Sequence, residues 1–333
     1  MKFVIAIVLF SVIILFHELG HFLLAKKNGI RVNEFCLGLG PTIIGFTKGE
    51  TKYSIKLLPF GGACMMEGED GESEDAGSFQ SKSVLARISV VAAGPVFNFL
   101  MAFAFSVIVI ACHGYNAPVI TGVMQDFSAQ EAGMQAGDRI VKMDHKRIHF
   151  YKEVSAYTLF HPGETVEVTY ERDGKTYQAT LTPKYDEASG RQLLGLQSNN
   201  EYVRTGFFET IKYGFQEMKY WVWYTVGSLK MLVTNQVSFN DLSGPVGIVK
   251  TVADTYEQSL ADGIYYVFLN MLNLAILLSA NLGVMNLLPI PALDGGRLVF
   301  LIIEGIREMC IRDSFRCISP GSAGGGDPGI ISG

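Results

Sequence analysis

The chain has 333 residues, of which 49% are hydrophobic and only 18% are charged, and its mean hydropathy is +0.26. Because ordinary soluble domains carry about 25% charged residues, this composition indicates a membrane protein with a soluble portion. The net charge of −5 gives no support to a nucleic-acid partner, and five cysteines without paired spacing support neither a disulfide framework nor a cysteine-type zinc site.

The first predicted element is an apolar segment at residues 3–25, with the sequence FVIAIVLFSVIILFHELGHFLLA. A bilayer crossing takes about 20 apolar residues, so this segment is long enough to span a membrane. A secretory signal peptide is the alternative, since Lys2 precedes an apolar stretch. We favour the span because the apolar run continues past two histidines and no small-residue cleavage site follows it.

Two further spans are predicted at residues 84–112 and 264–288, whereas an apolar run from Leu298 stops after nine residues and is too short to cross. The first and second spans belong to the first half of the membrane domain, residues 1–112, and the third span belongs to its second half, residues 264–307. Lysine and arginine flank the loop after the first span, but none follows the second span until Arg139. Because basic residues favour the cytoplasmic side, we predict a cytoplasmic 26–83 loop and an extracytoplasmic region from His113 onward.

The 26–83 loop contains a predicted β-hairpin and an acidic run. Residues 38–63 alternate apolar with polar residues and are punctuated by glycine and proline, as strands joined by turns are. Residues 67–77 are mostly acidic and glycine-rich, so we expect a solvated loop there.

Residues 115–200 form the predicted soluble domain. The segment ETVEVTYERDGKTYQATLTP consists of two strand-like runs joined at Asp173-Gly174, which is a strong hairpin signal. The stretch QEAGMQAGDRIVKMDHKRI resembles the helix-turn-strand pattern of a PDZ domain, and this resemblance implies that a peptide binds by adding a strand to a sheet edge. Residues 203–235 follow, and their interspersed lysines predict an amphipathic helix at the membrane interface.

The chemistry is concentrated in HELGH, residues 17–21. His17 and His21 are four residues apart, so a helix places both imidazoles on one face, where they can share a metal ion. Glu18 is placed to take a proton from water at that metal, which completes the HExxH pattern of zinc proteases. Titratable groups are costly at membrane depth, which argues for a partner or a wet cavity around them. Satisfied polar residues in a helix interface are the alternative.

A catalytic zinc usually takes three protein ligands, and Asp294 in NLLPIPALDGGR is our candidate for the third. It follows the last predicted span, on the same side of the membrane as His17. Pro289 and Pro291 should break the helix there, so we expect Asp294 on an irregular segment. Its alternative role is the N-cap of the following apolar run.

Together, HExxH in the first span, Gly94, Pro95 and Asn98 in the second, one PDZ-like domain and NLLPIPALDGG resemble the site-2 proteases, which are intramembrane zinc metalloproteases. The resemblance covers about residues 1–307. It implies a polytopic α-helical membrane protein with an inserted extracytoplasmic PDZ domain and a membrane-associated β-hairpin. It also implies that His17, His21 and Asp294 bind Zn²⁺ and that Glu18 activates water. Asn286, Asn98, Gly94, Pro95, Pro289 and Pro291 are then expected to support the active site or the substrate.

The resemblance further implies the substrates, which would be single-span membrane proteins such as anti-sigma factors or remnant signal peptides. The chain would lie in the inner (plasma) membrane with its active site toward the cytoplasm. A non-catalytic PDZ-bearing membrane adaptor is the alternative function, and a soluble zincin is disfavoured by the extra apolar spans. Residues 309–333, rich in Gly, Ser and Pro, depart from the family, and we expect a non-native tail that replaces a last span.

Overall fold

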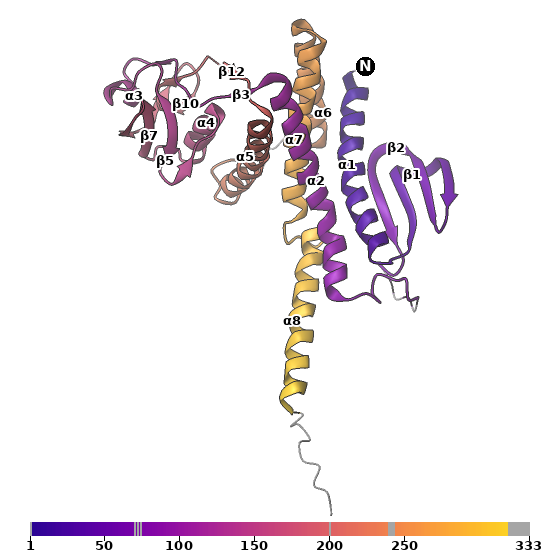
Figure 1. The fold of residues 1–333 in the computed structure, drawn as a ribbon. Coiled ribbons are helices and arrows are strands. Elements are labelled where there is room, and N and C mark those ends of the chain that lie inside the picture. The colour runs from indigo at the N-terminus through magenta and orange to yellow at the C-terminus, as the bar shows by residue number, and fades with distance from the viewer. Residues whose placement is uncertain are drawn as a thin grey trace, which may run out of the picture.

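The computed structural model describes residues 2–69, 71, 73, 75–199, 201–238 and 244–318, which fall into a helical bundle, a β-hairpin beside it and a small globular domain (Figure 1). Part of the predicted acidic loop lies outside the described residues, and so do residues 319–333 of the predicted 309–333 tail.

The bundle is built around three helices that are long and apolar enough to cross a membrane: α1 (Lys2–Lys27), α2 (Val84–His113) and α7 (Ile264–Asn286). They coincide with the three apolar segments of the sequence. The Ser83 side chain caps α2 by accepting a hydrogen bond from the Ala86 amide, and Lys26 and Lys27 complement the dipole at the end of α1. Both α1 and α7 pack against α2, which is therefore the centre of the bundle.

Three further helices surround this centre. Helix α5 (Phe207–Val233) lies in the predicted amphipathic segment and packs on α2 and α7. Helix α6 (Pro245–Asp262), which the sequence analysis missed, packs against α1 and α7. Helix α8 (Asp294–Ile318) starts against α2 and runs beyond the bundle (Figure 1).

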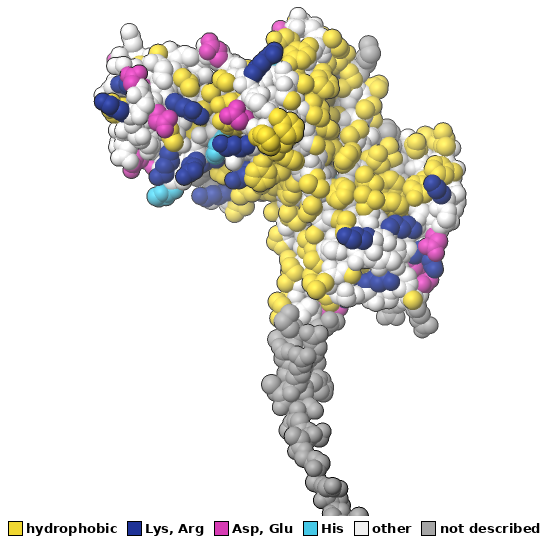
Figure 2. Space-filling model, viewed as in Figure 1, with side chains coloured by type: hydrophobic (Ala, Val, Ile, Leu, Met, Phe, Trp, Pro, Cys, Tyr) yellow, Lys and Arg dark blue, Asp and Glu magenta, His cyan; other side chains and the backbone are white. Residues whose placement is uncertain are grey.

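The hairpin consists of β1 (Val32–Lys48) and β2 (Thr51–Met66), so it is longer than the predicted 38–63. Its register folds the first part of β1 between two parts of β2, because Phe35 lies opposite both Cys64 and Tyr53. Residues 62–66 consequently form an edge that pairs on one side only among the described strands. The hairpin also exposes several apolar residues, namely Leu39, Ile43, Ile44, Phe46, Leu57 and Leu58. Figure 2 shows hydrophobic side chains gathered over the bundle and the hairpin.

In the sequence, the globular domain comes between α2 and α5, and it contains two short helices, α3 (Ser128–Glu131) and α4 (Tyr151–Phe160). Its main sheet has the strand order β6-β5-β7-β8, and shorter strands pair in twos. The strands are β3 (Tyr115–Asn116), β4 (Gly122–Val123), β5 (Arg139–Met143), β6 (Lys146–Arg147), β7 (Val166–Arg172), β8 (Lys175–Leu181), β9 (Lys184–Asp186), β10 (Arg191–Leu193), β11 (Leu196–Gln197) and β12 (Tyr202–Val203).

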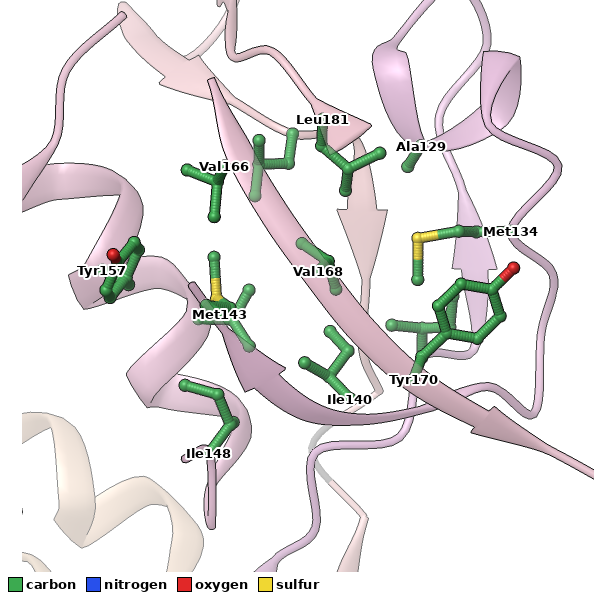
Figure 3. Packing of buried hydrophobic residues seen from close by; sticks show 13 residues of the cluster. Ala129, Met134, Ile140, Met143, Ile148, Tyr157, Val166, Val168, Tyr170 and Leu181 are labelled. Atoms are coloured by element: carbon green, nitrogen blue, oxygen red, sulfur yellow. The ribbon is translucent and has the colours of Figure 1, made fainter. Parts of the chain in front are cut away.

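The core of the globular domain is a compact apolar cluster in which Ile140, Met143 and Val168 are fully buried (Figure 3). On β7 buried and more exposed residues alternate, so one face of this strand points to the core and the other to solvent. On β5 the buried residues Ile140 and Met143 are three positions apart, and a register irregularity between Ile140 and Lys142 lets both face the core. The turn between β7 and β8 is Asp173-Gly174, with φ of 51° and 73°. Two positive φ values are what a two-residue type I′ turn requires, so the hairpin signal in the sequence had a direct backbone cause.

Candidate metal centre

Three ligand atoms from two distant parts of the chain converge in the bundle. Nε2 of His17 lies 3.2 Å from Nε2 of His21, and both residues are on α1. Oδ2 of Asp294, at the start of α8, lies 3.1 Å from the first of these nitrogens and 3.4 Å from the second. His17 and His21 are buried, each 8% exposed. The structure thus brings the three predicted zinc ligands together.

The spacing of these atoms fits one zinc ion. Zinc bonds of about 2.0–2.1 Å in a tetrahedral arrangement place neighbouring ligand atoms about 3.3 Å apart, which matches the observed 3.1, 3.2 and 3.4 Å. In addition, the buried Oδ2 of Asp294 faces only the two imidazole nitrogens and accepts no hydrogen bond from any other described residue. Burying a carboxylate oxygen without enough partners costs free energy, and a cation bound at this point would offset that cost.

The other ring nitrogen of each histidine has a partner on α2. Nδ1 of His21 lies 2.9 Å from the backbone oxygen of Val90, and Nδ1 of His17 lies 3.0 Å from the side-chain amide of Asn98. Such outer contacts orient the imidazole rings of metal ligands. Helix α2 therefore holds both rings from behind, while their Nε2 atoms face Asp294.

Gly94 explains how α2 comes so close to the histidines. A Cβ atom built on Gly94 would lie 2.3 Å from Nε2 of His21 and 2.6 Å from Cε1 of His17. Only glycine leaves this space free, so the role expected of Gly94 is steric. Pro95, the next residue, lies inside α2 and has no amide to offer the carbonyl of Val91, which lines the site.

Asp294 is placed by a helix start, and the expectation of an irregular segment was wrong. Asp294 is the first residue of α8, where the helix dipole favours a negative charge. The α7–α8 loop folds tightly over this start, since a Cβ on Gly295 would lie 2.3 Å from the Leu288 oxygen. The two prolines do end α7, but the chain re-enters a helix within a few residues because the glycine pair permits this close turn.

Glu18 lines the same cavity as the three ligands. The cavity has a volume of about 560 Å³ and is bordered on one side by the free β2 edge, residues 62–66. On this edge Gly62 packs closely against Glu18, since a Cβ atom at Gly62 would lie 3.1 Å from Cγ of Glu18. At the cavity mouth Arg297 of α8 forms an ion pair with Glu69, just beyond β2. The site thus combines a metal position, a carboxylate and an open strand edge.

Glu34 on β1 ties the two strands of the hairpin together. Its carboxylate accepts a hydrogen bond from the Ser54 hydroxyl and pairs with Lys52 and Lys56, each at 3.1 Å. The Ser54 hydrogen bond and the two lysines lower the pKa of Glu34 to about 2. Glu34 therefore stays ionised and ties β1 to the first part of β2 at neutral pH.

None of the six expected support residues is among the described residues that line the cavity. Three of them lie on α2, and the other three lie at or beyond the end of α7: Asn286 ends that helix, and Pro289 and Pro291 lie in the exposed loop that follows. Conversely, the sequence analysis predicted the hairpin but not which part of it forms the free edge, and it missed Val90 and Arg297. Only Arg297 had a local signal, because it follows the LDGG element directly.

Comparison with known proteins adds an independent finding. Residues 5–319 match the family model described as Peptidase family M50. A Clostridium acetobutylicum protein, a zinc metalloprotease by name, is 38% identical over 90% of this chain and 86% of its own length. The regulator of sigma-W protease RasP of Bacillus subtilis is 30% identical over 90% of this chain and 89% of its own length. The solved PDZ domain of an SdrC-like protein from Listeria monocytogenes is 23% identical over 25% of this chain and 86% of that chain, with a TM-score of 0.22.

Proposed function

The chain belongs to peptidase family M50, the site-2 proteases, and is thus a zinc metalloprotease of the membrane; from that premise we propose that it cleaves single-span membrane proteins within their transmembrane segments. The observation that carries the proposal is the convergence of His17, His21 and Asp294 on one point of a cavity that Glu18 and a free strand edge also line.

We propose that Nε2 of His17, Nε2 of His21 and a carboxylate oxygen of Asp294 hold the zinc. Bound there, zinc would supply a Lewis acid that acidifies water and polarises the scissile carbonyl. The two histidines are neutral ligands and Asp294 contributes one negative charge, so the ligand set leaves a net positive centre that favours a developing oxyanion.

Glu18 is the proposed general base and acid. Its carboxylate accepts a proton from the attacking water and then delivers that proton to the leaving amide nitrogen. Because Glu18 directly follows His17 on α1, the same helical turn positions the base and a ligand. Its side chain packs against Gly62 of the β2 edge, and both residues line the cavity.

The β2 edge, residues 62–66, is the proposed substrate-binding element. A transmembrane helix hides its peptide bonds in internal hydrogen bonds, so a substrate must unwind locally before it can be cut. A free strand edge offers replacement hydrogen bonds to the unwound backbone. This edge borders the cavity next to Glu18, so a strand paired with it would pass directly by the ligands.

We propose that the substrates are of the anti-sigma factor or remnant signal peptide type, an assignment supported by the name of the Bacillus subtilis relative. The globular domain would act as a PDZ domain that binds a peptide or excludes bulky substrates. It joins the end of α2 farthest from Gly94, whereas the zinc ligands lie near the opposite end of the bundle. The sign of the loop charges supports a globular domain outside the cytoplasmic membrane and a site toward the cytoplasm.

A cleavage assay in proteoliposomes tests this function. The wild type and Glu18→Gln are compared on a single-span substrate, with bound zinc measured in both. Glu18→Gln removes the proton acceptor but no ligand, so cleavage should fall by about 10²–10⁴-fold while zinc stays bound. Equal cleavage by both proteins would refute the role of Glu18. A metal-free native protein that still captures peptides would instead support the adaptor function.

A further inference from the structure

The two histidine ligands differ in the group that determines which ring nitrogen carries the proton. Nδ1 of His21 lies 2.9 Å from the backbone oxygen of Val90. A carbonyl oxygen can only accept, so the proton of His21 is on Nδ1 and the lone pair of Nε2 faces Asp294. The backbone of α2 thus sets the metal-binding tautomer of His21 without help from any side chain.

His17 has no such carbonyl, and its Nδ1 lies 3.0 Å from the Asn98 amide. An amide can either donate or accept there, since a half-turn about its last torsion exchanges oxygen and nitrogen. With the nitrogen toward His17, Nδ1 would accept, the ring proton would move to Nε2 and the lone pair needed for zinc would be lost.

We propose that Asn98 is a positioning residue whose side-chain oxygen accepts the Nδ1 proton of His17 and so reserves Nε2 for the metal. The inference rests on the proposed zinc site. It gives Asn98 the same role toward His17 that the Val90 carbonyl has toward His21, and it assigns that role to a side chain that is 0% exposed.

The surroundings of Asn98 suit a fixed acceptor. The Ser279 hydroxyl of α7 donates a hydrogen bond of 2.8 Å to the backbone oxygen of Asn98, which ties this part of α2 to α7. Asn98 also lies one turn beyond Gly94, so the helix face that approaches the histidines carries both residues. The Ser279 bond engages only the Asn98 backbone, and Ser279 is therefore a matched control for the side chain.

The test measures zinc affinity by competition with a chelator on the full-length chain in detergent. Asn98→Leu removes the acceptor at similar size and should weaken zinc binding by about 10–100-fold. Asn98→Asp keeps an acceptor oxygen but cannot donate, so its affinity should stay within about threefold of the wild type or exceed it. Ser279→Ala should leave the affinity unchanged. Thermal unfolding of each metal-free protein separates a folding defect from a binding defect, and Asn98→Thr supplies a second acceptor if Asn98→Asp does not fold.

Two results would overturn the inference while leaving the proposed function intact. The first is wild-type affinity in Asn98→Leu. The second is an acceptor variant that folds as stably as the wild type but binds zinc as weakly as Asn98→Leu, because the amide N–H would then be the group that matters. Equal zinc content in the wild type and His21→Ala would reject the zinc site itself, and the inference with it.

Discussion

The metal centre and the globular domain bury polar groups in opposite ways. In the globular domain, Asp138 is fully buried, and the Arg172 guanidinium donates two hydrogen bonds of 2.6 and 2.7 Å to it. Glu153 is also buried and accepts from Lys146 and from the backbone amides of His149 and Phe150. In the metal centre, Oδ2 of Asp294 is buried against the two imidazole nitrogens and accepts no hydrogen bond from any other described residue.

This difference between the two regions indicates where a ligand binds. Burying an unpaired polar atom costs free energy, and in the globular domain the chain supplies the partners itself. In the bundle it brings together two imidazole nitrogens and a carboxylate oxygen, which are the ligand types that zinc takes. Charge buried for structure is paired within the chain, whereas charge buried for function is left for a ligand to satisfy.

Removing the charge of Asp294 should break the metal centre most completely. Asp294→Asn keeps the shape of the side chain but removes the anionic ligand. Zinc sites are worth about 10–16 kcal/mol in total, so one of the ligands should account for about 4 kcal/mol, or roughly a 1000-fold loss of affinity. Chelator competition measures this loss. Asp262→Asn, at the exposed end of α6, is the matched control, and an equal effect of both changes would contradict the account.

Removing the charge of Glu153 should destabilise the globular domain and leave the zinc untouched. Burial opposes ionisation, but the His149 and Lys146 contacts outweigh it and lower the pKa of Glu153 to about 2. Because the folded pKa lies below the usual value of about 4.5, this stabilisation is present above pH 4.5 and is lost as the pH falls toward 2. By linkage it amounts to about 3 kcal/mol at pH 7.

Hydrogen exchange of the β5 and β7 amides in the full chain measures this effect. Protection in Glu153→Gln should be lower than in the wild type at pH 7, and the two proteins should converge as the pH falls from 4.5 toward 2. Glu171→Gln, on the exposed side of β7, is the control. A difference between wild type and Glu153→Gln that persists at pH 2 would show that another interaction is responsible.

Adding one methyl group at Gly94 should displace the histidines without changing any ligand. The Cβ of alanine would lie 2.3 Å from Nε2 of His21, so α2 must move away and zinc affinity should fall by about 10–100-fold, as for other disturbed outer contacts. Gly214→Ala is the control, because its Cβ would crowd Val107 of α2 away from the site. If both variants bind zinc like the wild type, close approach of α2 is not what positions the rings.

The smallest effect is expected at the turn of the globular domain. Gly174 has a φ of 73°, which an alanine adopts only with strain, so Gly174→Ala should lower the free energy of unfolding of this domain by about 1 kcal/mol. Thermal unfolding followed by hydrogen exchange gives the value, and bound zinc should not change. An unchanged stability would mean that the turn relaxes at no cost.

The features that sequence analysis could predict are local ones. His17 and His21 follow from a four-residue helical spacing, and the turn at Asp173-Gly174 follows from the backbone needs of two residues. Asp294 could be named because its motif is specific, but its place at the start of α8 depends on how the following glycines pack. The part of the predicted hairpin that forms the free edge and the contact of the Val90 carbonyl could not be predicted, because register and backbone contacts between distant segments leave no mark on residue type.

X-ray absorption of the zinc-loaded chain tests the central claim most directly, since it identifies the ligands without relying on activity. The account predicts nitrogen and oxygen scatterers at about 2.0–2.2 Å with the outer-shell signature of two imidazoles, which falls to one imidazole in His21→Ala. Cys64 lines the same cavity, so sulfur is the informative alternative. A sulfur scatterer at about 2.3 Å, or an imidazole signature unchanged in His21→Ala, would contradict the assignment of His17, His21 and Asp294 as the zinc site.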